Sequence, residues 1–212
     1  MQKGKFIVIE GQGFTGKTTQ ANLLVEKLKE VGIEAISVRH PGGTENAEKF
    51  RKQLLEKKAS GVLTPDEELE LILKALNSLV EELIVPELEN GKWVVLTRFF
   101  ASALVYQGYQ EGLDKDFIKE QVRKAALGLE PDLSILIDVP EEEIMRRQAE
   151  ASDNEIHAYN ESDLQVLKVR REGFLEVFGE FPDSVIVDST KSKEEVAREI
   201  WDAVGNSFNL TT

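Results

Sequence analysis

Short apolar runs alternate with longer stretches of helical periodicity along most of the chain. Apolar residues recur every three or four positions in the longer stretches, which predicts helices over 18–31, 46–57, 64–86, 116–129, 140–150, 162–178 and 193–204. The apolar runs are rich in β-branched and aromatic side chains, as is typical of buried strands, and cover residues 5–10, 34–38, 93–96, 133–138 and 185–188. The helix over 64–86 has the clearest start, because Thr64 and Glu67 fit a capping box and Pro65 suits the first helical position.

This alternation indicates the class of fold. Near-continuous apolar strands separated by helices are typical of a parallel sheet that is covered on both sides. The sequence therefore predicts an α/β fold, with a five-stranded parallel sheet and helices on both faces. A chain of 212 residues can form one such domain with a full core, but is too short for two of that size. No repeat or linker is visible, so we expect a single domain over 1–212.

Composition and charge exclude several classes of partner. The formal net charge is −13, and so acidic a surface argues against a nucleic acid polymer, whose phosphates require a basic stripe. No apolar run approaches the length of a membrane span, and the first residues lead into a strand without a signal peptide. The chain has no cysteine, which excludes disulfides, thiolate metal sites and a cysteine nucleophile. We therefore expect a cytoplasmic protein that binds neither membranes nor nucleic acid polymers.

A glycine-rich turn joins the first predicted strand to the first predicted helix. It matches G-x-x-x-x-G-K-[ST] in the required context, with Gly11, Gln12, Gly13, Phe14, Thr15, Gly16, Lys17 and Thr18. Glycines let the backbone wrap a phosphate, and the amides of the loop and of the helix N-terminus favour anions. We expect these residues and Thr19 to bind ATP. Lys17 would reach the β- and γ-phosphates, and the Thr18 hydroxyl would bind Mg²⁺.

Several stretches follow one another in the order of a known family. They are Glu10 with the turn and its continuation to Gln20, residues 39–44 (Arg-His-Pro-Gly-Gly-Thr), Arg98-Phe99 with Ser102 and Tyr106-Gln107-Gly108, Pro131-Asp132-Leu133 with Asp138-Val139, and Arg171-Glu172-Gly173-Phe174. Together they resemble the signature segments of the thymidylate kinase family of P-loop nucleoside monophosphate kinases. The resemblance runs from Phe6 to about Val204 and implies a P-loop NTPase fold.

The resemblance implies a function and a set of residues. The function is transfer of the γ-phosphoryl group of ATP to dTMP, giving dTDP in dTTP synthesis, by a homodimer with a lid at about 147–162. Lys17 and Arg98 would be catalytic, with Arg98 on the acceptor's phosphate, because a forked guanidinium suits a phosphate. The implied substrate-binding positions are Arg39, Pro41, Leu73, Asn77, Arg98, Ser102, Tyr106 and Gln107.

Some positions depart from the family's pattern. Gly13 stands where the family's loop usually carries a carboxylate, and Thr97 stands where the third strand usually ends in aspartate. Leu73 and Asn77 stand where the family has an aromatic ring and a second phosphate-binding arginine, and Glu111 replaces a cation. These changes remove charges that phosphoryl transfer normally uses.

Other residues are candidates to replace the missing groups. Lys74 is a candidate for the arginine, and Glu10 or Asp138 for the carboxylate. Arg146 and Arg147 are the cations nearest the expected lid, which contains no further Lys or Arg. Two alternatives to a dTMP kinase therefore stay open: a kinase of the same fold with another nucleotide or nucleoside acceptor, and a nucleotide-binding paralogue with weakened catalysis.

Overall fold

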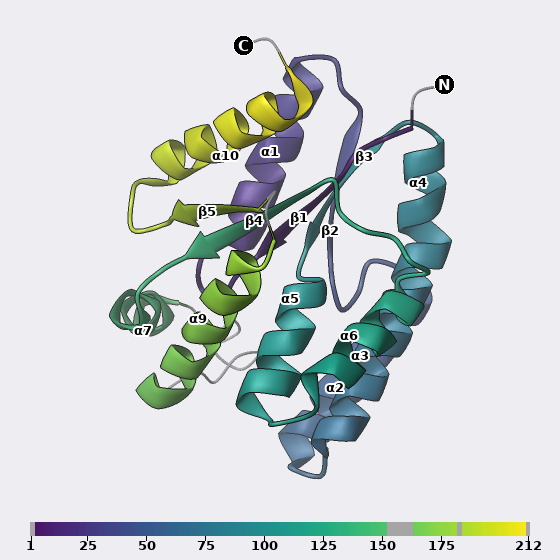
Figure 1. Ribbon diagram of the computed structural model, residues 1–212, viewed down its shortest axis with the longest axis vertical. Coiled ribbons are helices and arrows are strands. Elements are labelled where there is room, and N and C mark those ends of the chain that lie inside the picture. Colours follow the sequence, from purple (N-terminus) through teal and green to yellow (C-terminus); the bar gives the residue numbers. More distant parts are fainter. Residues whose placement is uncertain (1–2, 152–162, 182–183, 211–212) are drawn as a thin grey trace.

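A parallel sheet forms the centre of the protein, whose computed structural model describes residues 3–151, 163–181 and 184–210 (Figure 1). The strands are β1 (Phe6–Glu10), β2 (Ala35–Arg39), β3 (Trp93–Thr97), β4 (Leu133–Asp138) and β5 (Ser184–Asp188). They lie in the order β2-β3-β1-β4-β5, and every pairing between neighbours is parallel. The predicted α/β fold with a five-stranded parallel sheet is confirmed.

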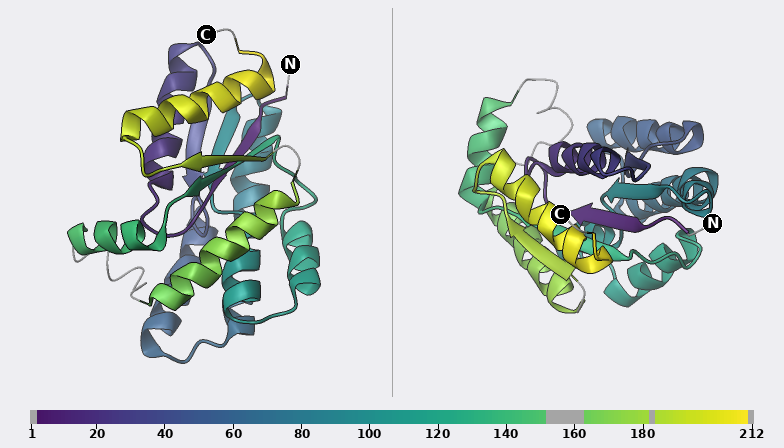
Figure 2. Two further views of the ribbon diagram at one scale, coloured as in Figure 1. Left: turned by 60° about the vertical axis from the view of Figure 1, so that its left-hand side comes forward. Right: turned by 90° about the horizontal axis from the view of Figure 1, so that it is seen from above.

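The two faces of the sheet bury alternate residues of each strand. Ile9 of β1 belongs to a core with α1 (Lys17–Glu30) and α10 (Lys193–Phe208), whereas Val8 belongs to the core on the other face. Successive side chains of a strand point to opposite faces, so one wholly apolar strand supplies both cores. Helices α1 and α10 contact each other and lie side by side in Figures 1 and 2. The prediction of helices on both faces is therefore also confirmed.

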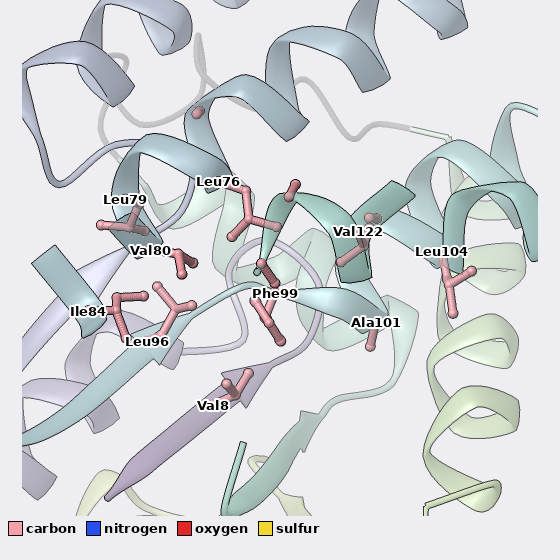
Figure 3. Close-up of a cluster of buried hydrophobic side chains, with 14 of the residues drawn as sticks. Val8, Leu76, Leu79, Val80, Ile84, Leu96, Phe99, Ala101, Leu104 and Val122 are labelled. Atoms are coloured by element: carbon pink, nitrogen blue, oxygen red, sulfur yellow. The ribbon is translucent and has the colours of Figure 1, made fainter. Parts of the chain in front are cut away.

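The second face is covered by several helices. They are α2 (Glu45–Ser60), α3 (Pro65–Leu79), α4 (Val85–Glu89), α5 (Phe100–Ala103), α6 (Lys115–Ala125) and α9 (Leu164–Gly179). Leu76 and Leu79 of α3 lie in one buried cluster with Leu96 of β3 (Figure 3). Helix α7 (Glu141–Glu150) lies at the edge of the molecule beside α9 (Figure 2). None of the helices in the described ranges is long and apolar enough to cross a membrane.

The helix predicted over 64–86 begins as expected but ends later. Thr64 and Glu67 form a capping box, as predicted. After α3 the chain continues through a π-helical segment, η1 (Val80–Ile84), into α4, so the helix runs to Glu89 and not to Pro86. A proline ring clashes with the carbonyl four residues earlier in a regular α-helix, and the wider π-turn before Pro86 relieves that clash.

A helical segment that the periodicity did not predict follows β3. Helix α5 continues into a second π-helical segment, η2 (Leu104–Gln110). Because Ala101, Leu104 and Val105 are all buried, the segment lacks the alternation of polar and apolar faces that reveals an amphipathic helix. The segment carries Ser102, Tyr106 and Gln107, which the resemblance implies as substrate-binding residues.

Candidate active site

The loop between β1 and α1 has the geometry of a phosphate-binding turn. Gly11 has a φ of 138°, and a Cβ there would lie 2.5 Å from the carbonyl oxygen of Ile137, so no other residue fits. The Lys17 side chain is buried against the loop, where its Nζ donates to the Gln12 carbonyl and, over 3.3 Å, to Thr15 Oγ1. The ammonium group therefore lies beside the main chain that is expected to wrap the phosphates.

The N-terminus of α1 suits an anion and a metal ion. Its first turn contains no acidic side chain, so nothing neutralises the partial positive charge of the helix end. Thr18 and Thr19 lie in this turn and are exposed, so the Thr18 hydroxyl is accessible to Mg²⁺. Within the described residues, no group of three or more His, Cys, Asp or Glu is arranged to hold a metal.

The apex of the loop is attached to the two helices that flank the expected lid. Phe14, at a φ of 57°, packs in a small apolar cluster that includes Ile144 of α7 and Leu167 of α9. Gln12 Nε2 donates to the Leu167 carbonyl (3.0 Å), and Arg147 NH1 donates to the Phe14 carbonyl (3.3 Å). These contacts offset the cost of the left-handed backbone at Phe14, which is about 1–2 kcal/mol. Of the expected lid, residues 152–162 lie outside the described residues.

The two arginines of α7 have different surroundings. Arg146 is exposed and pairs with Glu143 and Glu150 on the same helix. Hydrogen bonds from Arg146 and then Arg147 lower the pKa of Glu143 to about 2. Arg147 also reaches the loop and donates to the carbonyl of Ser189, which follows β5. Arg147 is therefore the better candidate for contact with the nucleotide donor.

Arg98 lies between the phosphate-binding loop and the residues that are expected to bind the acceptor. It follows β3 with a φ of 69°, and its NH1 donates to Tyr106 Oη (3.1 Å), Ser102 Oγ (3.4 Å) and the carbonyl of Gly11 (3.4 Å). Its guanidinium carbon is 5.1 Å from the centre of the Tyr106 ring. One side chain thus contacts both the start of the phosphate loop and the residues expected to bind the acceptor.

Glu10 holds the turn that carries Arg98. Its buried carboxylate accepts hydrogen bonds from the backbone N–H groups of Phe99 (2.8 Å) and Ser102 (3.1 Å) and from Ser102 Oγ (2.6 Å). Asp138, the other candidate, accepts three hydrogen bonds from Arg171, at 2.9 Å, 3.2 Å and 2.8 Å. Both carboxylates are used to hold protein groups, which argues against either replacing the missing carboxylate near Thr97.

A cavity of about 810 Å³ lies beside Arg98, between α2, α3, η2 and α9. Its wall includes five of the residues expected to bind substrate: Pro41, Arg98, Ser102, Tyr106 and Gln107. Gln107 Nε2 donates to Glu68 Oε1 (3.4 Å), which fixes the orientation of the amide. In the part of the chain that the structure describes, Gln107 Oε1 has no hydrogen-bond partner. Gln107, a residue of the cavity wall, thus carries a buried acceptor without a partner among the described residues.

Leu73 and Asn77, which are also expected to bind substrate, do not line this cavity. Both line a separate hollow on the outer surface of α3, and Asn77 Nδ2 donates to the Ala125 carbonyl (3.2 Å). Ile72 lines the acceptor cavity instead. The cavity-wall residue Ile72 is thus one position before the expected Leu73, and one residue turns a helix by about 100°. Lys74 shares the outer surface and pairs with Glu70, so it does not replace the arginine.

Arg39 also lies outside the cavity wall. Its NH2 is 2.8 Å from Glu48 Oε1, and its NH1 donates to the Pro41 carbonyl (3.1 Å). Glu48 in turn accepts the backbone N–H of Gly43 (3.1 Å). Arg39 thus holds the turn over 39–44 in shape, while Pro41 contacts the cavity.

His40 is a wall residue that the sequence reasoning did not select. Its Nε2 is 3.0 Å from the carbonyl oxygen of Ile72, which can only accept, so Nε2 carries the proton. Burial, together with repulsion from Arg98 and Arg51, lowers the pKa of His40 from 6.5 to about 4. The imidazole is therefore neutral at neutral pH and contributes no charge to the cavity.

Arg51 of α2 is a second wall residue that was not selected. Its NH1 donates to the Pro41 carbonyl (3.2 Å). A signal for it exists in the sequence, because Ala47, Arg51 and Leu54 are spaced by four and three residues and so share one face of the helix. Ala47 and Leu54 are buried, which places Arg51 on the inner face.

Known proteins share these features over nearly the whole chain. A family model described as thymidylate kinase matches residues 9–200. The thymidylate kinase of Caldanaerobacter subterraneus subsp. tengcongensis is 38% identical over 204 residues, which is 95% of either chain. Those of Thermoanaerobacter sp. strain X514 and Chlorobaculum tepidum are 38% and 37% identical, covering 95% and 93% of this chain and 98% and 95% of their own. The protein has a P-loop NTPase fold and belongs to the thymidylate kinase family.

Proposed function

We propose that this protein is a dTMP kinase, which transfers the γ-phosphoryl group of ATP to dTMP and gives dTDP for dTTP synthesis. The observation that carries the proposal is the position of Arg98. It contacts the Gly11 carbonyl at the start of the phosphate loop and also lines the acceptor cavity. Donor and acceptor phosphates therefore meet at one guanidinium, as an in-line transfer requires. Membership of the family supports dTMP as the acceptor.

ATP binds on the loop between β1 and α1, over residues 11–19. The loop amides and the N-terminus of α1 hold its phosphates, and Lys17 neutralises charge that develops on the β- and γ-phosphate oxygens. The Thr18 hydroxyl would hold Mg²⁺, which would supply further charge neutralisation when bound. Arg147 lies on the donor side, against the Phe14 carbonyl.

The acceptor cavity has the net charge that a nucleoside monophosphate needs. Its wall holds four cations and two carboxylates: Arg51, Lys58, Arg98, Arg170, Glu56 and Glu68. Since His40 is neutral, the excess of two positive charges matches a phosphate monoester, which carries about −2 at neutral pH. Gln107 Oε1 would accept the N3–H of thymine, and Ile72 and Leu54 would contact the base.

A coupled assay of ADP release tests the proposal. Purified protein is given ATP, Mg²⁺ and one of dTMP, dUMP, dCMP, dAMP, dGMP or thymidine. We expect dTMP to give the highest kcat/KM. Stronger stimulation by another compound would favour the same fold with another acceptor. No stimulation by any of them would contradict kinase activity.

Thr97 favours a second candidate, a nucleotide-binding paralogue with weakened catalysis. No aspartate ends β3, and the nearby carboxylates of Glu10 and Asp138 hold protein groups. Calorimetry with ATP and Mg²⁺ separates the two candidates. Tight ATP binding together with negligible turnover for every acceptor would support the paralogue.

Kinship also supports a homodimer in the cytoplasm. The hollow on α3 contains Phe50 and Leu73, two partly buried apolar residues that a second copy would cover. Sedimentation equilibrium would test the assembly, and a monomer at micromolar concentration would contradict it. Cell fractionation would test the location.

A further inference from the structure

Two guanidinium groups from distant parts of the chain approach the same tyrosine ring. The guanidinium carbon of Arg98 is 5.1 Å from the centre of the Tyr106 ring, and that of Arg170 is 4.6 Å from it. Arg98 follows β3, whereas Arg170 lies in α9. Both side chains line the acceptor cavity. The cavity therefore contains a pair of cations that is assembled only in the folded protein.

The position of Arg170 is well defined by its surroundings. The residue is 8% exposed, and its Nε donates to Gln110 Oε1 over 2.6 Å. This hydrogen bond and the contact with the Tyr106 ring fix the orientation of the guanidinium group. A planar group held in this way is suited to recognise a phosphate, because little side-chain entropy is lost on binding.

Electrostatics favours an anion near this pair. Like charges repel each other more strongly in a poorly solvated cavity than in water. The π face of a tyrosine offsets part of that repulsion. A phosphate dianion that contacts both guanidinium groups would offset much more.

The wall holds two further cations, Arg51 and Lys58, which also contact protein groups. Lys58 is 3.0 Å from a carboxylate oxygen of Glu68, and Arg51 donates to the Pro41 carbonyl. Helix α3 presents Ile72 to the cavity and directs Lys74 away from it. The second phosphate-binding arginine that the resemblance placed on α3 is therefore absent there.

We propose that Arg170 binds the acceptor's phosphate together with Arg98. Helix α9 thus supplies the second guanidinium that α3 lacks. The assignment rests on the proposed function, since it takes the acceptor to be a nucleoside monophosphate.

The test compares a nucleotide with its nucleoside. Binding of dTMP is measured by calorimetry, and binding of thymidine by NMR titration, for the wild type, Arg170→Met and Arg170→Lys. We expect Arg170→Met to weaken dTMP binding about tenfold or more, as for a charge-assisted hydrogen bond, and to leave thymidine binding within about twofold. Arg170→Lys retains the charge and should recover part of the loss. Arg123→Met, which removes an exposed cation of α6, is the matched control and should change neither affinity.

Each other outcome decides against the assignment. Equal losses of dTMP and thymidine binding would mean that Arg170 shapes the nucleoside pocket, and unchanged dTMP binding would mean that it does not touch the phosphate. If the wild-type protein does not bind dTMP, the proposed acceptor is wrong. The role of Arg170 is then decided by the same comparison with a monophosphate that the protein does bind and with the corresponding nucleoside. If the protein binds no monophosphate, both proposals are overturned.

Discussion

The donor loop and the acceptor cavity meet at Arg98, but the chain builds them in different ways. The donor site is one continuous segment, residues 11–19, held between a strand and a helix. The acceptor cavity collects side chains from α2, α3, η2 and α9, which are up to about half the chain apart in sequence. The donor site is therefore fixed by local conformation, and the acceptor site by how helices pack against one another.

This difference separates what substitutions can do. A change in the loop alters contacts that the backbone itself makes with phosphate, so its effect should fall on the chemical step. A change in the cavity wall alters one of several side chains around the acceptor, so its effect should fall on acceptor affinity. Residues that only hold the two sites together should affect stability first.

The largest effect is expected on the donor side, for Lys17→Met. Loss of the ammonium that neutralises the transferring phosphoryl group should lower kcat by about 10³-fold or more. Steady-state ADP release at saturating ATP and dTMP measures it. Lys27→Met, which removes an exposed cation paired with Glu30, is the control and should keep full activity. A residual rate above one tenth of the wild type would show that another cation performs this role.

On the acceptor side, Arg98→Lys should lower kcat/KM for dTMP by about 10²-fold, because a lysine cannot make the paired hydrogen bonds of a guanidinium. The Kd for ATP, measured by calorimetry in the absence of acceptor, should stay within about threefold. A comparable loss of ATP affinity would mean that the two sites are not separable at Arg98.

Protonation of His40 should lower the free energy of unfolding at acidic pH. Its pKa is about 4 when folded and near 6.5 when unfolded, so the unfolded chain binds more protons between these values. The free energy of unfolding should therefore fall as the pH drops from about 6.5 to 4, by roughly 3 kcal/mol at most. Urea unfolding of the wild type and of His40→Asn is measured at several pH values. The difference between their free energies of unfolding gives the contribution of His40. Parallel pH profiles would show that His40 is protonated without penalty.

Glu10→Gln should destabilise the fold by about 2 kcal/mol, since an amide cannot accept all three hydrogen bonds of the buried carboxylate. Urea unfolding at neutral pH measures the loss. The matched control is Glu26→Gln on the exposed side of α1, which should leave the midpoint unchanged. A stable Glu10→Gln protein with normal acceptor affinity would remove Glu10 from its role in holding the Arg98 turn.

The smallest effect tests the register of α3. Ile72→Ala should raise the KM for dTMP by about fivefold, through loss of roughly 1 kcal/mol of apolar contact. Lys74→Ala, two residues further on, should leave that KM unchanged because its side chain lies on the outer surface. If Lys74→Ala raised the KM for dTMP and Ile72→Ala did not, the face of α3 that the sequence pattern favoured would be the one that contacts the acceptor.

Local sequence predicts the sheet, the donor loop and the helix starts. The glycines and Lys17 could be located from spacing alone, because each acts through the conformation of its own segment. Arg98 and Tyr106 were found through the family resemblance, and the structure places both in the cavity wall.

The residues that were missed depend on contacts between segments. Ile72 lines the cavity, whereas the expected Leu73 lies on another face of the same helix, and helical periodicity alone does not show which face meets the cavity. Arg170 reaches Tyr106 only through the packing of α9 against η2. The helix that carries Tyr106 was missed because most of its residues are buried, so that it has no clear polar stripe.

The π-turn η1 also has a consequence for chain length. A widened turn stores a surplus residue without displacing the helix on either side, so deleting one residue within Val80–Ile84 would shorten the chain and leave α3 seated as before. Relatives that differ by a single residue here can thus retain the same pocket. An alignment that permits gaps only in loops would then assign their pocket residues to the wrong columns.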